Sequence, residues 1–163
     1  MRHNLEFLYK ENWFAEINDS VKNPMLRLYK TFKKSFEFES YIKNISDRKI
    51  QKSISQFRLS SHCLRIHTGR QERDKTGKNT PAHKRFCLNC KSGKIDDELH
   101  LITSCETHNA ERTVLFSNIS TLIDLRCPAS ELLPNILNSE DKTVTHEFGK
   151  FLNIAFMKRK SAK

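Results

Sequence analysis

Residues 87–105 read CLNCKSGKIDDELHLITSC and carry four side chains that can bind a metal ion. Two residues separate Cys87 from Cys90, nine more precede His100, and a further four precede Cys105. Two cysteines so spaced can present both sulfurs to one ion from a tight turn. His100 and Cys105 then supply a second pair from about one and a half helical turns. Three thiolates and one imidazole are the donors of a closed, tetrahedral structural zinc site.

The residues that follow Cys90 favour a zinc site over a redox motif. A thioredoxin-like Cys-x-x-Cys pair follows a strand and leads directly into a helix, whereas residues 91–94 (KSGK) are typical of a turn. Residues 96–98 (DDE) then offer an N-cap and first-turn acids for a helix that reaches Cys105. The alternative to a metal site is a set of buried or free thiols.

A closed ligand set has consequences for the role of the metal. With four protein ligands, no open coordination position remains for water, which argues against catalytic zinc. Structural zinc in small modules is worth ~10–16 kcal/mol apparent, so metal binding and folding are linked. His83 and His108 are possible substitute ligands with poorer spacing, and we expect both to be solvent-exposed histidines. Cys63 and Cys127 lie outside the four-ligand pattern, and we expect them to act as ordinary small apolar residues.

Length and composition indicate one domain that is mainly α-helical. The chain has 163 residues, eleven Phe that can fill a core, and only four Gly and four Pro, which argues against a turn-rich sandwich or barrel. We therefore expect a helical domain with one small zinc knuckle, built from a short hairpin plus a helix. Residues 1–80 form its basic helical part, residues 81–110 the knuckle, and residues 111–163 the C-terminal helices, within one compact domain overall.

Hydropathy and cysteine usage suggest where the protein works. No apolar run approaches the roughly 18 residues of a membrane span, so we expect no membrane-spanning segment, and nucleic acid rather than a membrane as the partner. The first residues lack the apolar core and cleavage site of a signal peptide. Five cysteines is an odd number that fits a reducing setting better than a disulfide framework. The sequence therefore predicts an intracellular protein, nuclear or cytoplasmic, whose oligomeric state it leaves open.

Positive charge is concentrated just before and across the knuckle. The whole chain has a net charge of +10, and the segment from Arg48 to Lys94 holds thirteen Lys or Arg and two acids, a net charge of +11. A basic segment of this kind indicates a polyanion partner, RNA or DNA first and an anionic membrane second. The alternative is a solvated basic surface that only keeps the protein soluble. Phosphate contacts are expected from Arg58, Arg65, Arg70, Arg73, Lys84 and Arg85.

Helical spacing predicts several elements before the knuckle. A stripe of Leu5, Leu8, Tyr9, Trp13 and Ile17 predicts a first helix that packs on the core. Residues 25–36 fit a helix better than a strand, and residues 39–45 fit a short helix. Residues 70–81 have no periodic apolar positions and predict a mobile loop.

The next helix should begin at an Asp47 N-cap. Its buried stripe is expected to comprise Ile50, Ile54, Phe57 and Leu64, and its unit to end at Gly69. The side chains that should lie away from this stripe are Arg48, Lys49, Lys52 and Arg58.

Three helical segments are expected after the knuckle. One starts at Thr107 or Asn109 and carries the apolar residues Leu115, Ile119, Leu122 and Ile123. Residues 130–137 are short and interrupted by a proline. Ser139 should cap a last helix over residues 144–156, whose basic end at residues 158–160 suits the helix dipole and frays into a tail.

The order of these motifs resembles that of a known protein region. The chain is similar to the zinc-binding tail that follows the polymerase domain of non-LTR (LINE-type) reverse-transcriptase-like proteins. The similarity covers roughly residues 12–160, and its specific part runs from residue 58 to residue 105. The matching stretches are Arg58-Leu-Ser-Ser-His62, Leu64-Arg-Ile66, Gly69-Arg70, Lys84-Arg-Phe-Cys87-Leu-Asn-Cys90, Asp96-Asp-Glu-Leu-His100 and Cys105.

The resemblance implies a retrotransposon-type module that binds template RNA or target DNA beside a reverse-transcriptase polymerase domain. It implies Cys87, Cys90, His100 and Cys105 as the zinc ligands. His67 departs from the family, which usually carries an acid at that place. No polymerase motif is present, because residues 96–97 are better explained as a helix cap than as a magnesium-binding pair.

Other functions remain open from the sequence. The segment from residue 95 to residue 141 has a net charge of −7 and could pack on a basic protein partner, which would make the chain a scaffold, or on the basic half of this same chain. The chain could also be a non-functional remnant of a mobile element. A metal-dependent nuclease is disfavoured because residues 96–98 and 140–141 have no partner acid on a recognisable strand, so we expect no enzyme. Phe86 could stack on an unpaired base or be buried against the zinc site.

Overall fold

The chain is mainly helical, as its composition predicts. The computed structural model describes residues 2–73 and 75–161, and within these ranges the only β pairing consists of the isolated bridges Arg73–Asn79 and Phe86–Ile95. Three short 3-10 turns lie at Pro24–Arg27, Ala82–Lys84 and Glu106–His108. The helices are α1 (Arg2–Asn18), α2 (Tyr29–Phe32), α3 (Ser40–Asn44), α4 (Arg48–Arg58), α5 (Arg65–Thr68), α6 (Glu98–Thr103), α7 (Asn109–Ile119), α8 (Ala129–Leu137) and α9 (Lys142–Ser161).

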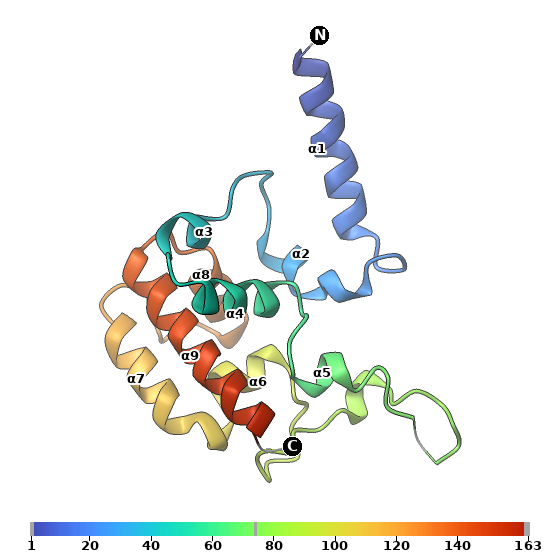
Figure 1. Cartoon of the computed structure of the whole chain (residues 1–163), viewed down its shortest axis with the longest axis vertical. Helices are drawn as coiled ribbons and strands as arrows, with labels where there is room; N and C mark the ends of the chain where they lie inside the picture. The colour runs from blue at the N-terminus through green and yellow to red at the C-terminus, as the bar shows by residue number, and fades with distance from the viewer. Residues whose placement is uncertain (1, 74, 162–163) are drawn as a thin grey trace.

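Helix α9 is the centre of the fold. It lies between α4 and α7 in Figure 1 and also contacts α3 and α8. Its apolar face is fully enclosed, with Leu152 and Ala155 at 0% exposed. Phe57 of α4 meets Phe148 of α9 edge to face, with ring centroids 5.4 Å apart. The predicted last helix is therefore the element on which the others pack.

A glycine lets α4 and α9 approach closely. A Cβ atom on Gly149 would lie 2.3 Å from Ile50 Cγ2 and 2.9 Å from Ile54 Cδ1 of α4. Both separations are shorter than van der Waals contact, so the side-chain hydrogen of glycine is what this helix crossing requires. Ile50 and Ile54 are themselves buried, as the predicted stripe of α4 demands.

Helix caps explain where two of the helices begin. The Asp47 carboxylate accepts hydrogen bonds from the backbone amides of Lys49 and Ile50, which confirms the predicted cap of α4. At the start of α9 the cap is Asp141, which accepts from Thr143 N at 2.7 Å and from Val144 N at 3.1 Å. The prediction of Ser139 was wrong, because its hydroxyl accepts instead from the backbone amide of Asp141.

Helix α1 departs from the prediction in its packing. The apolar spacing does form a helix, but Leu5, Leu8 and Tyr9 are 64%, 55% and 72% exposed, and only Ile17 is buried. In Figure 1 the helix extends away from the rest of the molecule. Its attachment lies near its end, where Trp13 meets Phe36 with ring centroids 5.3 Å apart. The expectation of core packing along α1 was therefore wrong.

Two predicted apolar stripes extend beyond the helices that carry them in the structure. Helix α4 ends at Arg58, and buried Leu64 lies in the connection before α5 rather than on α4 itself. Gly69 caps α5 as expected. Helix α7 ends at Ile119, which leaves Leu122 at 46% exposed instead of on the buried face.

Candidate metal centre

A tight turn brings Cys87 and Cys90 together. The amide of Cys87 donates to Lys94 O at 2.8 Å, and the amide of Asp96 donates to Arg85 O at 2.9 Å. Gly93 has a φ of +67°, a left-handed conformation that glycine adopts without strain. The pairing at its base is a single antiparallel bridge between Phe86 and Ile95, rather than the predicted strand hairpin.

Helix α6 supplies the other half of the cluster. The Asp97 carboxylate caps it by accepting from the amide of His100 at 2.8 Å, as the sequence predicts. The amide of Cys105 then donates to His100 O at 2.8 Å, which folds the chain back just after the helix ends. His100 and Cys105 therefore face the turn from one short helix and its C-terminal connection.

Four buried side chains meet between the turn and α6. The ligand atoms of Cys87, Cys90, His100 and Cys105 all lie within 4.8 Å of one another. Cys87 Sγ is 4.0 Å from Cys105 Sγ, and Cys90 Sγ is 3.2 Å from His100 Nε2. A tetrahedral site with zinc–sulfur bonds of about 2.3 Å separates its sulfurs by about 3.8 Å. The cluster therefore has the size and donor set of a four-coordinate metal site.

Hydroxyl groups support two of the candidate ligands. His100 Nδ1 lies 3.0 Å from Ser104 Oγ, which orients the ring so that Nε2 faces the sulfurs. Ser92 Oγ lies 3.1 Å from Cys90 Sγ. Outer contacts of this kind fix ring orientation and ligand basicity in metal centres.

An arginine from the last helix completes the surroundings. Arg159 is 3% exposed, and its Nη2 donates to Cys105 Sγ at 3.5 Å and to Cys87 Sγ at 3.8 Å. The hydrogen bond with Cys87 and the charge of Arg159 lower the pKa of Cys105 to about 7, although burial opposes this shift. The expectation that residues 158–160 form a frayed basic tail was wrong for Arg159, which is buried.

The two histidines considered as substitute ligands differ in their surroundings. His83 is exposed, as expected. His108 is 0% exposed, and its Nε2 accepts from Arg159 Nε at 3.0 Å. Burial, followed by the charge of Arg159, lowers the pKa of His108 to about 4, so the ring is neutral near pH 7. The expectation of a solvent-exposed His108 was therefore wrong.

Two acids beside the cluster are buried and paired. Asp96 is 1% exposed and accepts from Arg159 Nη1 at 2.8 Å and from the amide of Arg65 at 2.9 Å. Glu98 is 1% exposed and accepts from Ser60 Oγ at 2.9 Å, with His62 Nε2 at 3.0 Å.

These pairings give both acids roles that the sequence did not predict. Burial alone would raise the pKa of Glu98, but His62 and Arg27 lower it to about 2. Asp96 and Glu98 hold the knuckle to the segments around residues 60–65 and to α9, whereas the sequence assigned them only to the start of a helix.

Arg58 is not available for the phosphate contact expected of it. It is 3% exposed, forms an ion pair with Glu39, and donates to Leu137 O at 2.5 Å. Its guanidinium also lies 4.3 Å from the ring centroid of Phe32. The arginine at the end of α4 therefore joins α3, α8 and the segment around Phe32, because its partners come from three separate parts of the chain.

Two more of the expected arginines are engaged within the protein. Arg65 forms an ion pair with Glu72, which raises the pKa of Arg65, and its Nη1 donates to Phe86 O at 3.0 Å. Arg85 donates to Ile66 O at 2.7 Å and to Thr80 O from both Nε and Nη2. Both side chains brace the knuckle against α5 and the connection after it.

The remaining expected contacts lie at the surface. Arg73 and Lys84 are exposed, and Arg70 is half-buried with its Nη2 donating to Pro24 O at 3.0 Å. Phe86 is 44% exposed, so the structure does not bury this ring against the cluster. The structure therefore brings the four candidate metal ligands together, but of the six basic residues it buries Arg58 and leaves only Arg73 and Lys84 exposed.

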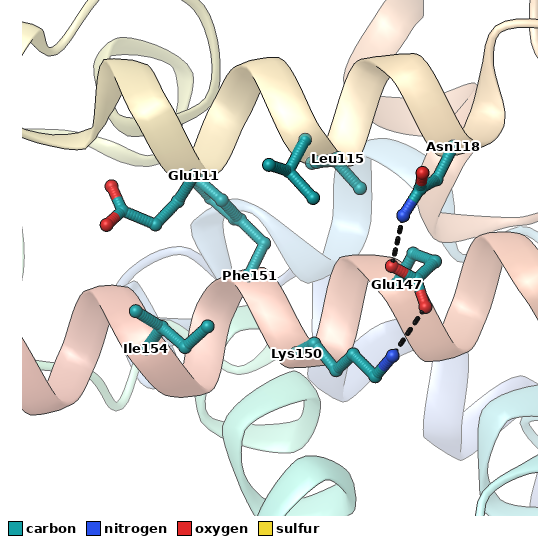
Figure 2. A pocket seen from close by; sticks show the side chains of 8 residues that line it. Glu111, Leu115, Asn118, Glu147, Lys150, Phe151 and Ile154 are labelled. Carbon is teal, nitrogen blue, oxygen red and sulfur yellow. Dashed lines mark hydrogen bonds and ion pairs between the residues drawn. The ribbon is translucent and has the colours of Figure 1, made fainter.

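A hollow lies away from the cluster, between α7 and α9 (Figure 2). Glu147 is part of its lining and accepts from Asn118 Nδ2 at 2.7 Å and from Lys150 Nζ at 2.8 Å. Leu115 and Phe151 form part of its lining. These polar contacts are internal to the two helices, so the hollow is explained by their packing.

Comparison with other proteins gives no information on the cluster, so its interpretation depends on the chemistry of its side chains. No known protein family, curated protein or solved structure matches this chain. Among the described residues, no helix combines the length and the hydrophobicity that crossing a bilayer requires.

Proposed function

We propose that the chain is a non-catalytic nucleic-acid-binding module stabilised by zinc. The observation that carries this proposal is the buried cluster of three thiols and one imidazole at the end of the most basic segment of the chain, residues 48–94. The related proposal is that the module acts beside a reverse-transcriptase polymerase domain, on the strength of the motif order in residues 58–105.

Zinc is the metal that best fits these donors. Three soft sulfur ligands and one imidazole disfavour Mg²⁺ and Ca²⁺, which prefer oxygen, and this set of four protein donors is typical of structural zinc. Since all four ligands are buried and come from the protein, the ion would stabilise the fold and leave no position for a reacting water. The bound ion would supply folding energy by joining the turn at Cys87 to α6.

The nucleic-acid part of the proposal depends on surface charge near the knuckle. Exposed basic side chains lie just before the knuckle, at Arg73 and Lys75, and within it, at Lys84, Lys91 and Lys94. Phosphate contacts from such residues release counterions, so they give sequence-independent and salt-sensitive binding. Arg58, Arg65 and Arg85 are left out of this proposed surface because they are buried or half-buried and their head groups bind protein groups. Arg73 donates to Gly77 O but is exposed.

Metal content tests the first part of the proposal. Native mass spectrometry with elemental analysis should give one zinc per chain, and Cys87→Ser should lose it. Cys127→Ser is the matched control, because Cys127 is a free cysteine outside the four-ligand cluster. A wild-type protein that binds no zinc after purification in zinc-containing buffer would contradict a structural metal site.

Salt dependence tests the second part. Affinity for a labelled single-stranded RNA should fall steeply between 50 and 200 mM salt, with each phosphate contact contributing about 0.7 to the logarithmic slope. Replacing Arg73, Lys84 and Lys91 by Gln should lower that slope by about 2. The control is a triple Gln variant at Lys22, Lys43 and Arg126, which are exposed and lie elsewhere in the chain. A flat salt response in the wild type would rule out the phosphate-contact proposal.

A protein-binding role is the second candidate, and the exposed apolar side chains of α1 favour it. Leu5 and Leu8 lie about one turn apart on a helix that extends from the body, Phe7 lies between them in the sequence, and each is more than half exposed. Capture of a purified reverse-transcriptase polymerase domain that is lost with Leu8→Asp, alongside no RNA binding, would favour this candidate over the first.

A further inference from the structure

The side chain of Arg159 reaches the cluster from the far end of the fold. It lies in the last turns of α9, 54 residues after Cys105 and 72 residues after Cys87, yet it touches both sulfurs. Its nearest sequence neighbours, Lys158 and Lys160, are exposed. An arginine buried among basic neighbours at a helix end requires a specific partner, because desolvating a guanidinium is costly.

Each nitrogen of the Arg159 guanidinium has a different partner. Nε donates to His108 at 3.0 Å, and Nη1 donates to both Asp96 oxygens at 2.8 and 3.0 Å. Nη2 is then directed at the sulfurs of Cys105 and Cys87. The planar fork of arginine can serve three directions at once, whereas the ammonium of lysine is a single point charge. Asp96 and His108 therefore fix the orientation in which Nη2 meets the sulfurs.

Charge balance explains why a cation is needed there. Zinc bound by three thiolates and a neutral imidazole carries one net negative charge, and the four ligands are buried. A guanidinium hydrogen-bonded to two of the thiolates withdraws electron density from the sulfurs and offsets part of that charge, because Arg159 also shares its positive charge with the Asp96 carboxylate. Arg112 adds to the same region by donating to Cys105 O at 2.9 Å, but it reaches the backbone and not a sulfur.

We propose that Arg159 is a positioning residue of the metal centre, acting as the hydrogen-bonded counterion of the Cys105 and Cys87 thiolates and coupling metal binding to the docking of α9. The proposal rests on metal binding by the cluster. It gives the last helix a role in retaining the metal, which the spacing of the four ligands does not predict.

Cobalt substitution and a competing chelator test this role. Arg159→Lys keeps the positive charge but loses the fork, and it should still bind one metal ion per chain. We expect its metal affinity to fall by about 10- to 100-fold, as for other outer contacts of metal sites. The sulfur-to-cobalt charge-transfer band should move to lower energy because the thiolates become more electron-rich. Lys160→Gln is the matched control and should leave both readouts unchanged.

The outcomes separate this proposal from the metal site itself. A wild type that binds no zinc or cobalt would overturn both. A wild type that binds metal, with Arg159→Lys folded and showing an unchanged band and an unchanged affinity, would overturn only the role of Arg159.

A measurement on the wild type covers the case in which the variant does not fold. Exchanging Zn²⁺ for Cd²⁺ changes the charge on the sulfurs, so the Nη2 protons of Arg159 should shift in NMR spectra. The protons of Arg126, which is exposed far from the cluster along the chain, should not. Unmoved Arg159 protons would overturn the proposal.

Discussion

Helices α1 and α9 have similar apolar spacing in the sequence but opposite degrees of burial in the structure. Both are long, with 17 and 20 residues, and both carry apolar residues at helical spacing. Leu8 of α1 is 55% exposed, whereas Leu152 is 0% exposed on α9, a helix that lies between α4 and α7. The difference teaches that periodicity determines whether a segment is helical, while its burial depends on partners elsewhere in the chain.

Removal of the metal should have the largest effect, and it should affect only one of the two helices. Structural zinc in small modules is worth ~10–16 kcal/mol apparent. With a strong chelator we expect fast hydrogen exchange in residues 85–108 and in the last turns of α9, which lose the anchor at Arg159. Exchange in α1 should be the same with and without metal. If amides around Arg159 stayed protected from exchange in the metal-free protein, the end of α9 would not depend on the metal, which contradicts this prediction.

A pair of matched leucine substitutions sharpens the comparison next. Leu152→Ala removes a fully buried side chain from α9 and should lower the free energy of unfolding by about 2–5 kcal/mol. Leu8→Ala makes the same chemical change on α1 and should alter it by no more than about 0.5 kcal/mol. Urea denaturation followed by circular dichroism measures both. Equal losses in the two variants would mean that α1 is packed on a partner in solution.

The close contact of α9 with α4 predicts a smaller loss. In Gly149→Ala the new methyl group overlaps Ile50 and Ile54, at a cost of about 1–3 kcal/mol. The better helix propensity of alanine offsets up to about 1 kcal/mol of this, so a net loss of about 1 kcal/mol is expected. Met157→Ala on the exposed side of the same helix is the control for thermal unfolding. A Gly149→Ala protein as stable as the control would show that the helices can separate freely.

The attachment of α1 should give the smallest effect. Trp13 is the single tryptophan of the chain, so its fluorescence reports on this junction alone. Phe36→Ala removes one aromatic contact, worth about 0.5–1.5 kcal/mol, and should shift Trp13 emission to longer wavelength. The unfolding midpoint of the body should stay the same. Phe7→Ala, also on α1, should leave the emission as it is, and a shift there of equal size would contradict a local junction at Trp13.

Features set by neighbouring residues were predictable from the sequence. The spacing of Cys87, Cys90, His100 and Cys105 identified the cluster, because a turn and a short helix determine where these side chains point. Asp47 and Asp97 were recognisable as caps, since a capping side chain needs only the amides two or three residues ahead. These are local interactions that one stretch of sequence contains in full.

Features set by distant residues were not. Arg159 meets Asp96 across 63 residues, and Arg58 meets Leu137 O across 79 residues. From the sequence alone a basic residue on a helix is expected at the surface, because its distant partners are not known. Both arginines were therefore predicted to contact solvent or phosphate. The exposed stripe of α1 is the converse case, in which apolar spacing suggested a partner that the described residues do not supply.

The separation between the ligands and Arg159 has a consequence for how the molecule is assembled during translation. The four ligands occupy 19 consecutive residues, whereas Arg159 follows Cys105 by 54. At a synthesis rate of about 5–20 residues per second, that interval is about 3–11 s. A metal ion captured by the nascent chain would therefore be held by a site that still carries its excess negative charge. The last helix would then be drawn to it by attraction as it leaves the ribosome.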